Sequence, residues 1–224
     1  MKLAVQIATS LVLGLAFFGL VLFLPAGTFD YWQAWVFVAV FSVSTFVPSM
    51  YLAIRHPDAL ARRMKAGPTA ESRPAQRIII TATFLAGIAV MVISALDWRF
   101  GWSAVPVWLV IAGDVLVAAG LLGAQLVVVQ NNYAGASITV EEDQPLVSTG
   151  LYGVVRHPMY ALSLIMMLGT PPALGSLWGL TAVVAAVPVL VARLLDEEKA
   201  LTDDLAGYAE YTRQVPYRLI PGVW

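Results

Sequence analysis

The feature that most constrains this chain is a series of long apolar runs almost without charge. Each run has about the 20 residues that an α-helix needs to cross the hydrocarbon core of a bilayer. Only 12% of the 224 residues are charged and 59% are hydrophobic, whereas about a quarter are charged in a typical soluble domain. We therefore predict an all-α integral membrane protein. The first four predicted spans are residues 3–24, 31–54, 78–96 and 104–130.

A fifth apolar run, residues 159–192, is too long for one ordinary span. It is interrupted at residues 169–176, where prolines and glycines favour a helix break. We therefore expect a C-terminal helical hairpin, which brings the total to about six transmembrane helices. A polar tail with a cytoplasmic amphipathic helix would follow. The whole chain, 1–224, is predicted to be a single membrane domain, with four spans in 1–130 and the hairpin in 131–224.

The basic and aromatic residues orient these predicted spans. With six crossings, both termini and both long polar segments lie on one side of the membrane. Of the thirteen lysines and arginines, only Arg99 falls on the other side. Because cytoplasmic loops carry an excess of basic residues, we expect both termini in the cytoplasm. Tyr31, Trp32 and Trp35 are expected to anchor the second span at the interface.

Composition also excludes several kinds of site. The absence of cysteine excludes disulfides, thiolate nucleophiles and cysteine-ligated zinc. Only two histidines are present, far apart in sequence, so no metal site is expected. A net charge of −1 argues against nucleic acid as a partner. The sequence motifs of P-loop nucleotide binding, serine hydrolases and zinc proteases are absent from the sequence.

The two histidines, His56 and His157, each lie in the tripeptide Arg-His-Pro. Proline suits the first turn of a helix, where its missing N–H costs nothing. His56 has basic neighbours and is expected to mark a helix exit at the lipid headgroups. His157 lies between Tyr152 and Tyr160, and the N–H groups of a helix start there would favour an anionic ligand.

Several charged residues have both a structural and a functional interpretation. Arg193 and Glu197 are four residues apart and can pair on one helical face. Asp114 lies within a span and is expected to face the bundle interior through a structural polar contact. The basic pair Arg62-Arg63 is expected to contact lipid headgroups.

Spaced polar and aromatic residues lie on both sides of the predicted hairpin. In order they are Gly150, Tyr152, Arg156-His157-Pro158, Tyr160, then Arg193, Glu197-Glu198, Leu201, Tyr208 and Tyr211. This order is similar to that of the isoprenylcysteine carboxyl methyltransferase family. These are integral-membrane methyltransferases that use S-adenosylmethionine and are related to phospholipid N-methyltransferases. The resemblance covers residues 131–221 and departs from the family at Leu162, where glycine is common.

The resemblance implies a cofactor site formed by the segment before the hairpin and the helix after it. Glu197 would contact the amino-acid or ribose part of S-adenosylmethionine, and Arg193 would face the acceptor, so these two are the candidate catalytic residues. His157 would help to hold the cofactor and would not act as a general base. The full set of implied cofactor-binding residues is Gln144, Leu146, Val147, Tyr152, His157, Pro158, Met159, Tyr160, Glu197 and Glu198.

The function that follows is methyl transfer from S-adenosylmethionine to a lipophilic acceptor at the cytoplasmic membrane face, with S-adenosylhomocysteine as product. The acceptor group is a carboxylate, an amine or a thiol. Two alternatives stay open: an NADPH-dependent membrane reductase of sterol-reductase type, and a non-enzymatic membrane scaffold. The reductase pattern differs at Met159, Leu162 and Ser163. The expected partners are the bilayer and a lipophilic small molecule or lipid-modified acceptor.

Overall fold

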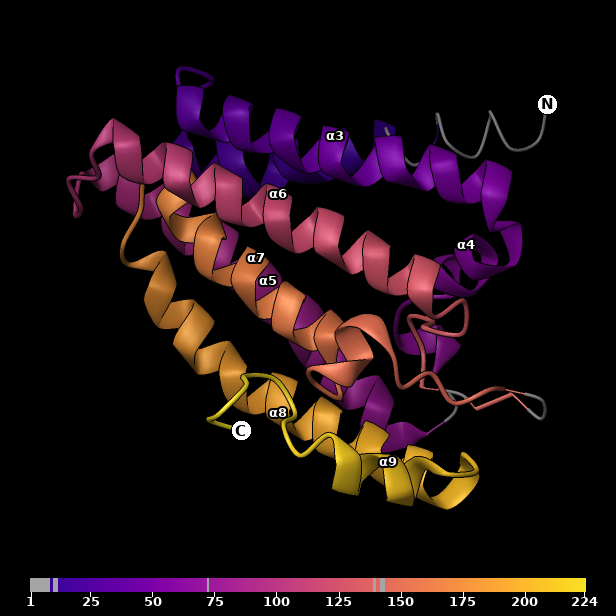
Figure 1. The fold of residues 1–224 in the computed structure, drawn as a ribbon. Coiled ribbons are helices and arrows are strands. Elements are labelled where there is room, and N and C mark those ends of the chain that lie inside the picture. Colours follow the sequence, from indigo (N-terminus) through magenta and orange to yellow (C-terminus); the bar gives the residue numbers. More distant parts are fainter. Residues whose placement is uncertain (1–8, 10–11, 72, 139, 142–143) are drawn as a thin grey trace.

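A computed structural model describes residues 9, 12–71, 73–138, 140–141 and 144–224. These residues form helices joined by turns and loops, and no strand occurs among them. Four of the helices are long and apolar enough to cross a membrane (Figure 1). The chain is therefore an all-helical integral membrane protein. The four helices are α3 (Trp32–Arg55), α5 (Pro74–Phe100), α6 (Val107–Gln130) and α8 (Gly179–Asp204).

Large apolar side chains cover the outer surface of these helices. Ile54, Ile78, Trp108 and Val184 are each 69–76% exposed. In water such a surface would be a site of association, whereas in a bilayer it contacts acyl chains. The exposed apolar surface therefore agrees with a location in the membrane.

The other helical elements are shorter. They are η1 (Gly19–Phe23), α2 (Leu24–Ala26), α4 (Pro57–Met64), η2 (Pro68–Ala70), η3 (Gly150–Gly153), α7 (Pro158–Ala173) and α9 (Tyr208–Gln214). The first predicted span lies partly outside the described residues, where the apolar helix covers Val12–Ala26. α7 has only 16 residues. The count of six crossings and the amphipathic role of the last helix therefore stay predictions.

α7 and α8 form the expected helical hairpin, but both helices extend further than predicted. α7 continues through Pro171 and Pro172 to Ala173, so the turn occupies residues 174–178. Packing of the buried residues 169–173 against neighbouring helices outweighs the local tendency of proline to break a helix. α8 runs without interruption to Asp204. The predicted end of the apolar run at residue 192 is therefore not a helix end, and the polar residues 193–204 continue the same helix.

Glycines allow α6 and α7 to approach closely. A Cβ added at Gly113 would lie 2.3 Å from the backbone nitrogen of Ala173, and one at Gly120 would lie 2.6 Å from the carbonyl oxygen of Leu162. Small residues of this kind let membrane helices pack backbone against backbone. The side chain of Leu162, which stands where the family resemblance predicts glycine, lies against Gly123 of α6, where an added Cβ would lie 2.5 Å from its Cδ2.

Asp97 joins the end of α5 to the turn between α7 and α8. The predicted third span stops at residue 96, but α5 continues to Phe100 and is capped by Gly101, whose φ is +63°. Asp97 is fully buried. In the last turn of α5 its carboxylate accepts hydrogen bonds from five donors. They are the backbone N–H groups of Ser103, Leu177 and Trp178 and the hydroxyls of Ser103 and Ser176.

Tyr31 packs in the core near this end of the bundle. Its hydroxyl donates to the carbonyl oxygen of Leu174 at 2.6 Å, and its ring stacks on Trp98 with centroids 4.3 Å apart. Its prediction as an interfacial anchor was wrong, because the hydroxyl finds its partner inside the protein. Trp32 and Trp35 are half exposed and remain available as anchors.

Candidate active site

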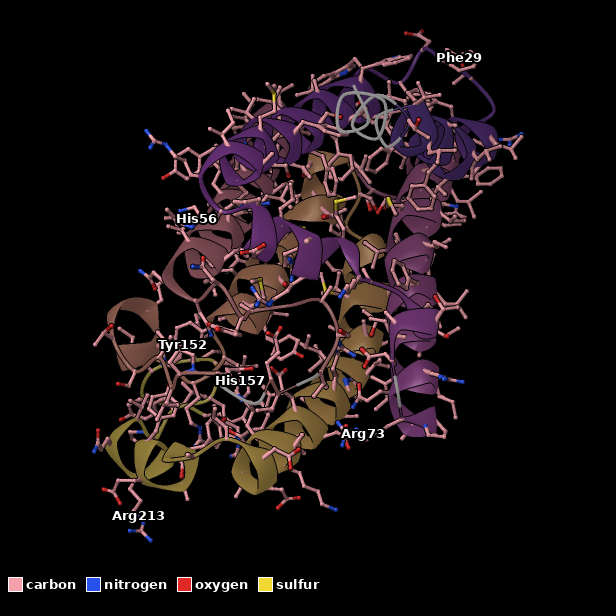
Figure 2. The ribbon with its side chains drawn as sticks, turned by 90° about the vertical axis from the view of Figure 1, so that its right-hand side faces the viewer. Phe29, His56, Arg73, Tyr152, His157 and Arg213 are labelled. Carbon is pink, nitrogen blue, oxygen red and sulfur yellow. The ribbon has the colours of Figure 1, made fainter. Side chains whose placement is uncertain are left out.

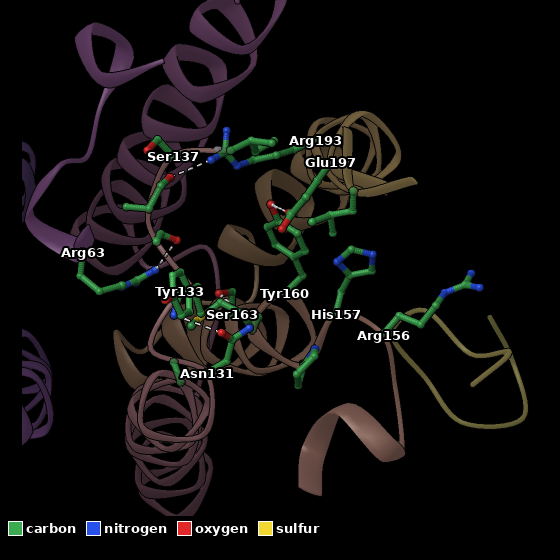
Figure 3. A pocket seen from close by; sticks show the side chains of 18 of the residues that line it. Arg63, Asn131, Tyr133, Ser137, Arg156, His157, Tyr160, Ser163, Arg193 and Glu197 are labelled. Atoms are coloured by element: carbon green, nitrogen blue, oxygen red, sulfur yellow. Dashed lines mark hydrogen bonds between the residues drawn. The ribbon is translucent and has the colours of Figure 1, made fainter. Parts of the chain in front are cut away.

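A cavity of about 520 Å³ lies at the end of α7 opposite Asp97. Small-molecule sites in proteins usually have volumes of about 300–1,000 Å³. The polar part of its wall comes from the loop 131–147, from η3 and from the facing ends of α7 and α8 (Figure 3). α5 and α6 add apolar residues such as Ile80, Phe84 and Leu121, and the segment before η3 adds Leu146 and Val147. The cavity therefore combines a polar mouth with a wall of membrane helices.

The turn before α7 positions Tyr152 at the cavity. Gly150 takes a φ of +62°, and a Cβ there would lie 2.8 Å from the side-chain amide of Gln130, so glycine suits this position. The hydroxyl of Tyr152 accepts a hydrogen bond from Nδ2 of Asn131 at 3.2 Å. Burial raises the pKa of Tyr152 to about 12. This hydroxyl therefore stays protonated at physiological pH.

His157 precedes α7, and Pro158 is the first residue of that helix, as the tripeptide predicts. The backbone N–H of His157 donates to the carbonyl oxygen of Arg218 at 3.0 Å, and the N–H of Arg156 donates to that of Tyr217 at 2.9 Å. The C-terminal segment after α9 is therefore held against the start of α7, and His157 is only 4% exposed.

Glu198 lies at the centre of a partly buried cluster of charges next to His157. Its carboxylate lies 2.9 Å from Nε of Arg156 and 3.3 Å from Nε2 of His157. It also accepts a hydrogen bond from Nε of Arg218 at 2.7 Å. Glu198 thus joins α8 to the residues before α7 and to the C-terminal segment.

Glu197, the neighbour of Glu198, faces the cavity. The hydroxyl of Tyr160 donates a hydrogen bond to Oε2 of Glu197, and both residues line the cavity together with His157. The rings of His157 and Tyr160 lie 5.6 Å apart. The carboxylate of Glu197 on α8 therefore lies beside the rings of Tyr160 and His157 at the start of α7. The predicted hairpin requires these two helix ends to be close.

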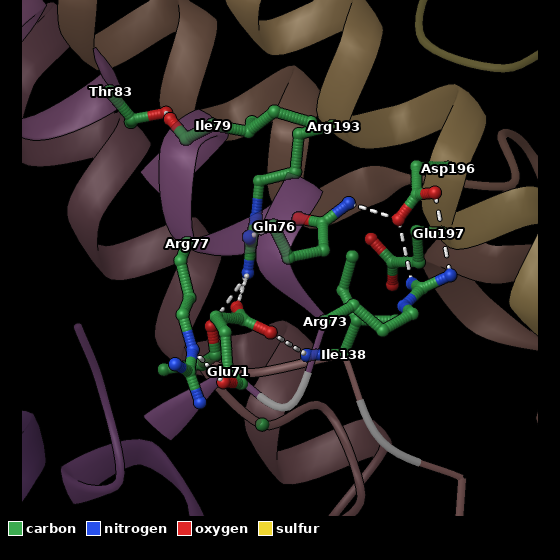
Figure 4. A network of polar contacts seen from close by, with 12 residues as sticks. Glu71, Arg73, Gln76, Arg77, Ile79, Thr83, Ile138, Arg193, Asp196 and Glu197 are labelled. Carbon is green, nitrogen blue, oxygen red and sulfur yellow. Dashed lines mark hydrogen bonds and ion pairs between the residues drawn. The ribbon is translucent and has the colours of Figure 1, made fainter. Parts of the chain in front are cut away.

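Arg193 also lines the cavity but does not pair with Glu197 among the described residues. Its guanidinium donates to Oε1 of Glu71 at 3.0 Å, to Oε1 of Gln76 at 2.9 Å and to the carbonyl oxygen of Ala136 at 2.8 Å (Figure 4). Arg73 lies 2.6 Å from Asp196 and extends this network. Arg193 therefore links α8, the start of α5 and the loop 131–147.

The two arginines at the end of α4 have different environments. Arg62 forms a two-point ion pair with Glu141, at 2.5 and 2.9 Å, and lies 4.4 Å from the ring centroid of Tyr133. Arg63 lines the cavity and donates to the carbonyl oxygen of Gly135 at 3.3 Å. The two arginines were predicted to contact lipid headgroups. Their contacts favour another role, because Arg62 binds Glu141 and Arg63 binds Gly135 in the segment that lines the cavity.

Tyr208 and Tyr211 of α9 close another side of the cavity. The hydroxyl of Tyr211 donates to the carbonyl oxygen of Tyr152 at 2.7 Å. The hydroxyl of Tyr208 is buried and has no hydrogen-bond partner within the described part of the chain. Burial raises the pKa of both tyrosines. Tyr208 therefore lines the cavity and has a neutral hydroxyl without a hydrogen-bond partner in the described part of the chain.

Most of the residues that the sequence singled out meet at this cavity, although their roles stay predictions. Glu198 is the exception, since it does not line the cavity and contacts basic side chains instead. The predicted residues that line the cavity are Gln144, Leu146, Val147, Tyr152, His157, Pro158, Met159, Tyr160, Arg193 and Glu197.

The sequence analysis did not identify the residues before the hairpin that line the cavity or support its wall. Glu71 and Gln76 are buried, yet they lie in a polar stretch that resembles an ordinary basic loop. Arg63, Asn131 and Tyr133 line the cavity although no motif marks them. The one signal available was the acidic Glu71 within a strongly basic segment.

Asp114 faces the bundle interior, as expected, and is 7% exposed. Its Oδ1 has no hydrogen-bond partner among the residues that the structure describes, so the predicted structural polar contact is not found there. Within those same residues no group of three histidine, aspartate or glutamate side chains is arranged to hold a metal ion.

Two comparisons with known proteins show what the chain is similar to. The chain is 26% identical over 163 residues to the cobalt-zinc-cadmium resistance protein CzcN of Cupriavidus metallidurans, covering 72% of this chain and 69% of that protein. The resemblance inferred from the spaced residues is confirmed at the level of a family: residues 108–207, from the start of α6 to just before α9, match the phospholipid methyltransferase family.

Proposed function

We propose that this protein transfers a methyl group from S-adenosylmethionine to a lipophilic acceptor at the cytoplasmic face of the membrane. The observation that carries the proposal is the cavity itself. The region that matches the phospholipid methyltransferase family supplies its polar mouth, and membrane helices supply its apolar wall. A polar cofactor and an apolar acceptor can therefore meet in one place. The resemblance to isoprenylcysteine carboxyl methyltransferases supports a carboxylate, amine or thiol as the acceptor group.

The residues at the polar end fit S-adenosylmethionine. Glu197 has one carboxylate oxygen bonded to Tyr160, and its carboxylate can accept hydrogen bonds from the cofactor's ammonium or hydroxyl groups. Tyr208 offers a buried hydroxyl with no hydrogen-bond partner in the described part of the chain. The electron-rich faces of Tyr152 and Tyr160 suit a sulfonium through cation–π attraction.

The apolar end supports an acceptor that arrives from the bilayer. Phe84 of α5 lines the cavity and is 54% exposed on the helix surface. Ile80, Leu121 and Met166 continue the apolar wall inward. A lipophilic chain could therefore stay in hydrocarbon while its head group reaches the polar residues.

Bound S-adenosylmethionine supplies a methyl group that is already activated by its attachment to a sulfonium. The protein must then hold the acceptor in line with that methyl group and exclude water. Such positioning can contribute on the order of 7–11 kcal/mol to catalysis. The buried clusters around Glu198 and Arg193 provide the rigidity, since they fix α8 against the start of α7 and the start of α5.

The location of the site relative to the membrane is part of the proposal. With the six crossings that the sequence predicts, the polar mouth lies on the side that carries twelve of the thirteen basic residues, and positively charged loops are typical of the cytoplasmic face. We infer that both termini and the cavity mouth are cytoplasmic, where S-adenosylmethionine is available.

Titration calorimetry with S-adenosylhomocysteine tests the cofactor site. The purified protein in lipid nanodiscs should bind it, and Glu197→Gln should weaken binding on the order of tenfold, or about 1.4 kcal/mol. The matched control is Glu210→Gln, an exposed acid on α9, which should bind as the parent does. No binding by the parent protein, or equal binding by Glu197→Gln, would contradict the assignment.

A further inference from the structure

Arg63 differs from the other arginines at the cavity in having no acidic partner. Three arginines line the cavity among the described residues. Arg156 lies 2.9 Å from Glu198, and Arg193 lies 3.0 Å from Glu71. The guanidinium of Arg63 instead donates one hydrogen bond, to the carbonyl oxygen of Gly135, which is uncharged. Its charge is therefore not balanced by any carboxylate in the described part of the chain.

The surroundings of Arg63 make such a charge costly. Its side chain points into the pocket near Tyr133 (Figure 3). Burial lowers the pKa of Arg63, while Tyr160 and Tyr152 raise it and Arg193 lowers it. A guanidinium nevertheless stays protonated in proteins. A cation that is held in a cavity without a counter-charge is stabilised when an anion binds beside it.

Arg63 and Glu197 lie on opposite sides of the cavity (Figure 3). In the proposed function Glu197 serves the cofactor, so the opposite side is left for the acceptor. The guanidinium presents a planar fork of N–H donors that matches the geometry of a carboxylate or phosphate. A protonated amine placed there would meet a like charge.

We propose that Arg63 binds an anionic group, a carboxylate or a phosphate, on the lipophilic acceptor. This inference rests on the proposed function and narrows its acceptor class. Acceptors whose only charge is a protonated amine are poor ligands of this site. Arg63 is a specificity-determining residue, placed by the end of α4 and by the carbonyl oxygen of Gly135.

Four amphiphiles with the same twelve-carbon chain test the proposal: dodecanoate, dodecyl phosphate, dodecanol and dodecylamine. Each is titrated against the protein in phosphatidylcholine nanodiscs that contain saturating S-adenosylhomocysteine. We expect either anion to bind at least about tenfold more tightly than the amine or the alcohol. Arg63→Gln should remove this preference, and Arg63→Lys should retain part of it because the charge remains.

The matched control is Arg55→Gln, which removes one exposed positive charge at the end of α3. It should keep the preference for anions, which separates site binding from general attraction to a basic surface. Equal affinity for all four amphiphiles in the parent protein, or an unchanged preference in Arg63→Gln, would overturn the proposal.

A separate binding experiment decides whether the anion held by Arg63 belongs to the acceptor or to the cofactor. If Arg63 holds the acceptor, Arg63→Gln binds S-adenosylhomocysteine with the parent affinity. If this variant loses cofactor affinity instead, Arg63 holds the carboxylate of the cofactor and the inference is wrong, while the proposed function still stands. Failure of the proposed function is recognised independently, because the parent protein would not bind S-adenosylhomocysteine at all.

Discussion

The two Arg-His-Pro tripeptides have similar local structure and different surroundings (Figure 2). His56 and His157 both precede a helix, with φ/ψ of −139°/57° and −124°/65°, and in both cases the proline is the first helical residue. Arg55 and Pro57 are exposed, whereas Arg156 and Pro158 are buried. The same three residues thus specify the same helix start, and distant parts of the chain decide which copy lines a cavity.

The decisive partner of the second tripeptide is Glu198. It lies against Arg156 and His157 and also binds Arg218 of the C-terminal segment. The first tripeptide has a ring contact between His56 and Tyr51, with centroids 5.9 Å apart, and His56 has no ion pair among the described residues. A helix start therefore becomes part of a site when a partly buried acid and a covering segment are added to it.

The largest expected effect on stability comes from removing Glu198, the acid that only the second tripeptide contacts. Glu198→Ala leaves Arg156 and Arg218 without their carboxylate and should lower the free energy of unfolding by about 3 kcal/mol. Glu210→Ala breaks an exposed pair with Arg213 and should cost about 0.5 kcal/mol or less. Unfolding in mixed micelles measures both. Equal losses would show that the buried cluster does not stabilise the second tripeptide.

The two histidines provide the direct comparison at the level of binding. His157→Ala removes a ring from the cavity wall and should weaken S-adenosylhomocysteine binding on the order of tenfold, or about 1.4 kcal/mol. His56→Ala should leave the affinity within about twofold, because His56 does not line the cavity. Calorimetry on both variants checks this. A comparable loss in the two variants would contradict the functional distinction between the tripeptides.

The smallest expected effect distinguishes Tyr208 from Tyr211, which both line the cavity beside the second tripeptide. Tyr211→Phe removes the hydrogen bond to the carbonyl oxygen of Tyr152 and should lower stability by about 1 kcal/mol. Tyr208→Phe removes a hydroxyl without a partner in the described part of the chain, so stability should hardly change while cofactor affinity falls. Thermal unfolding with and without S-adenosylhomocysteine distinguishes the two. A loss of stability in Tyr208→Phe without ligand would assign that hydroxyl a structural role.

The all-helical membrane class was predictable because apolar runs of about 20 residues have few other solutions. The hairpin was predictable too, and it brings Tyr160 and Glu197 together. Helix ends were less predictable. α5 continues through Asp97, whose carboxylate accepts a hydrogen bond from Ser176 of the α7–α8 turn, and α8 continues through Arg193, which donates to Glu71. Partners this far away in sequence cannot be predicted from local residues.

The residues in and around the cavity also fall into a group that could be predicted from the sequence and a group that could not. Those in the spaced pattern around the hairpin were predictable, since the motif itself carries their order. Arg63, which lines the cavity, was not predictable, and neither were Glu71 and Gln76, which lie behind the cavity wall and bind Arg193. All three come from segments far in sequence from the hairpin. Glu198 was expected at the cofactor, and its contacts place it beneath His157 instead.

Transfer of a labelled methyl group tests the central claim most directly. Nanodisc-embedded protein is incubated with methyl-labelled S-adenosylmethionine and a panel of lipids, prenyl-cysteine analogues and small thiols, and the organic phase is counted. We expect label in a lipophilic product with the parent protein and with His56→Ala, and strongly reduced label with Glu197→Gln. Binding of S-adenosylhomocysteine without label in any acceptor, or label that is unaffected by Glu197→Gln, would contradict the account.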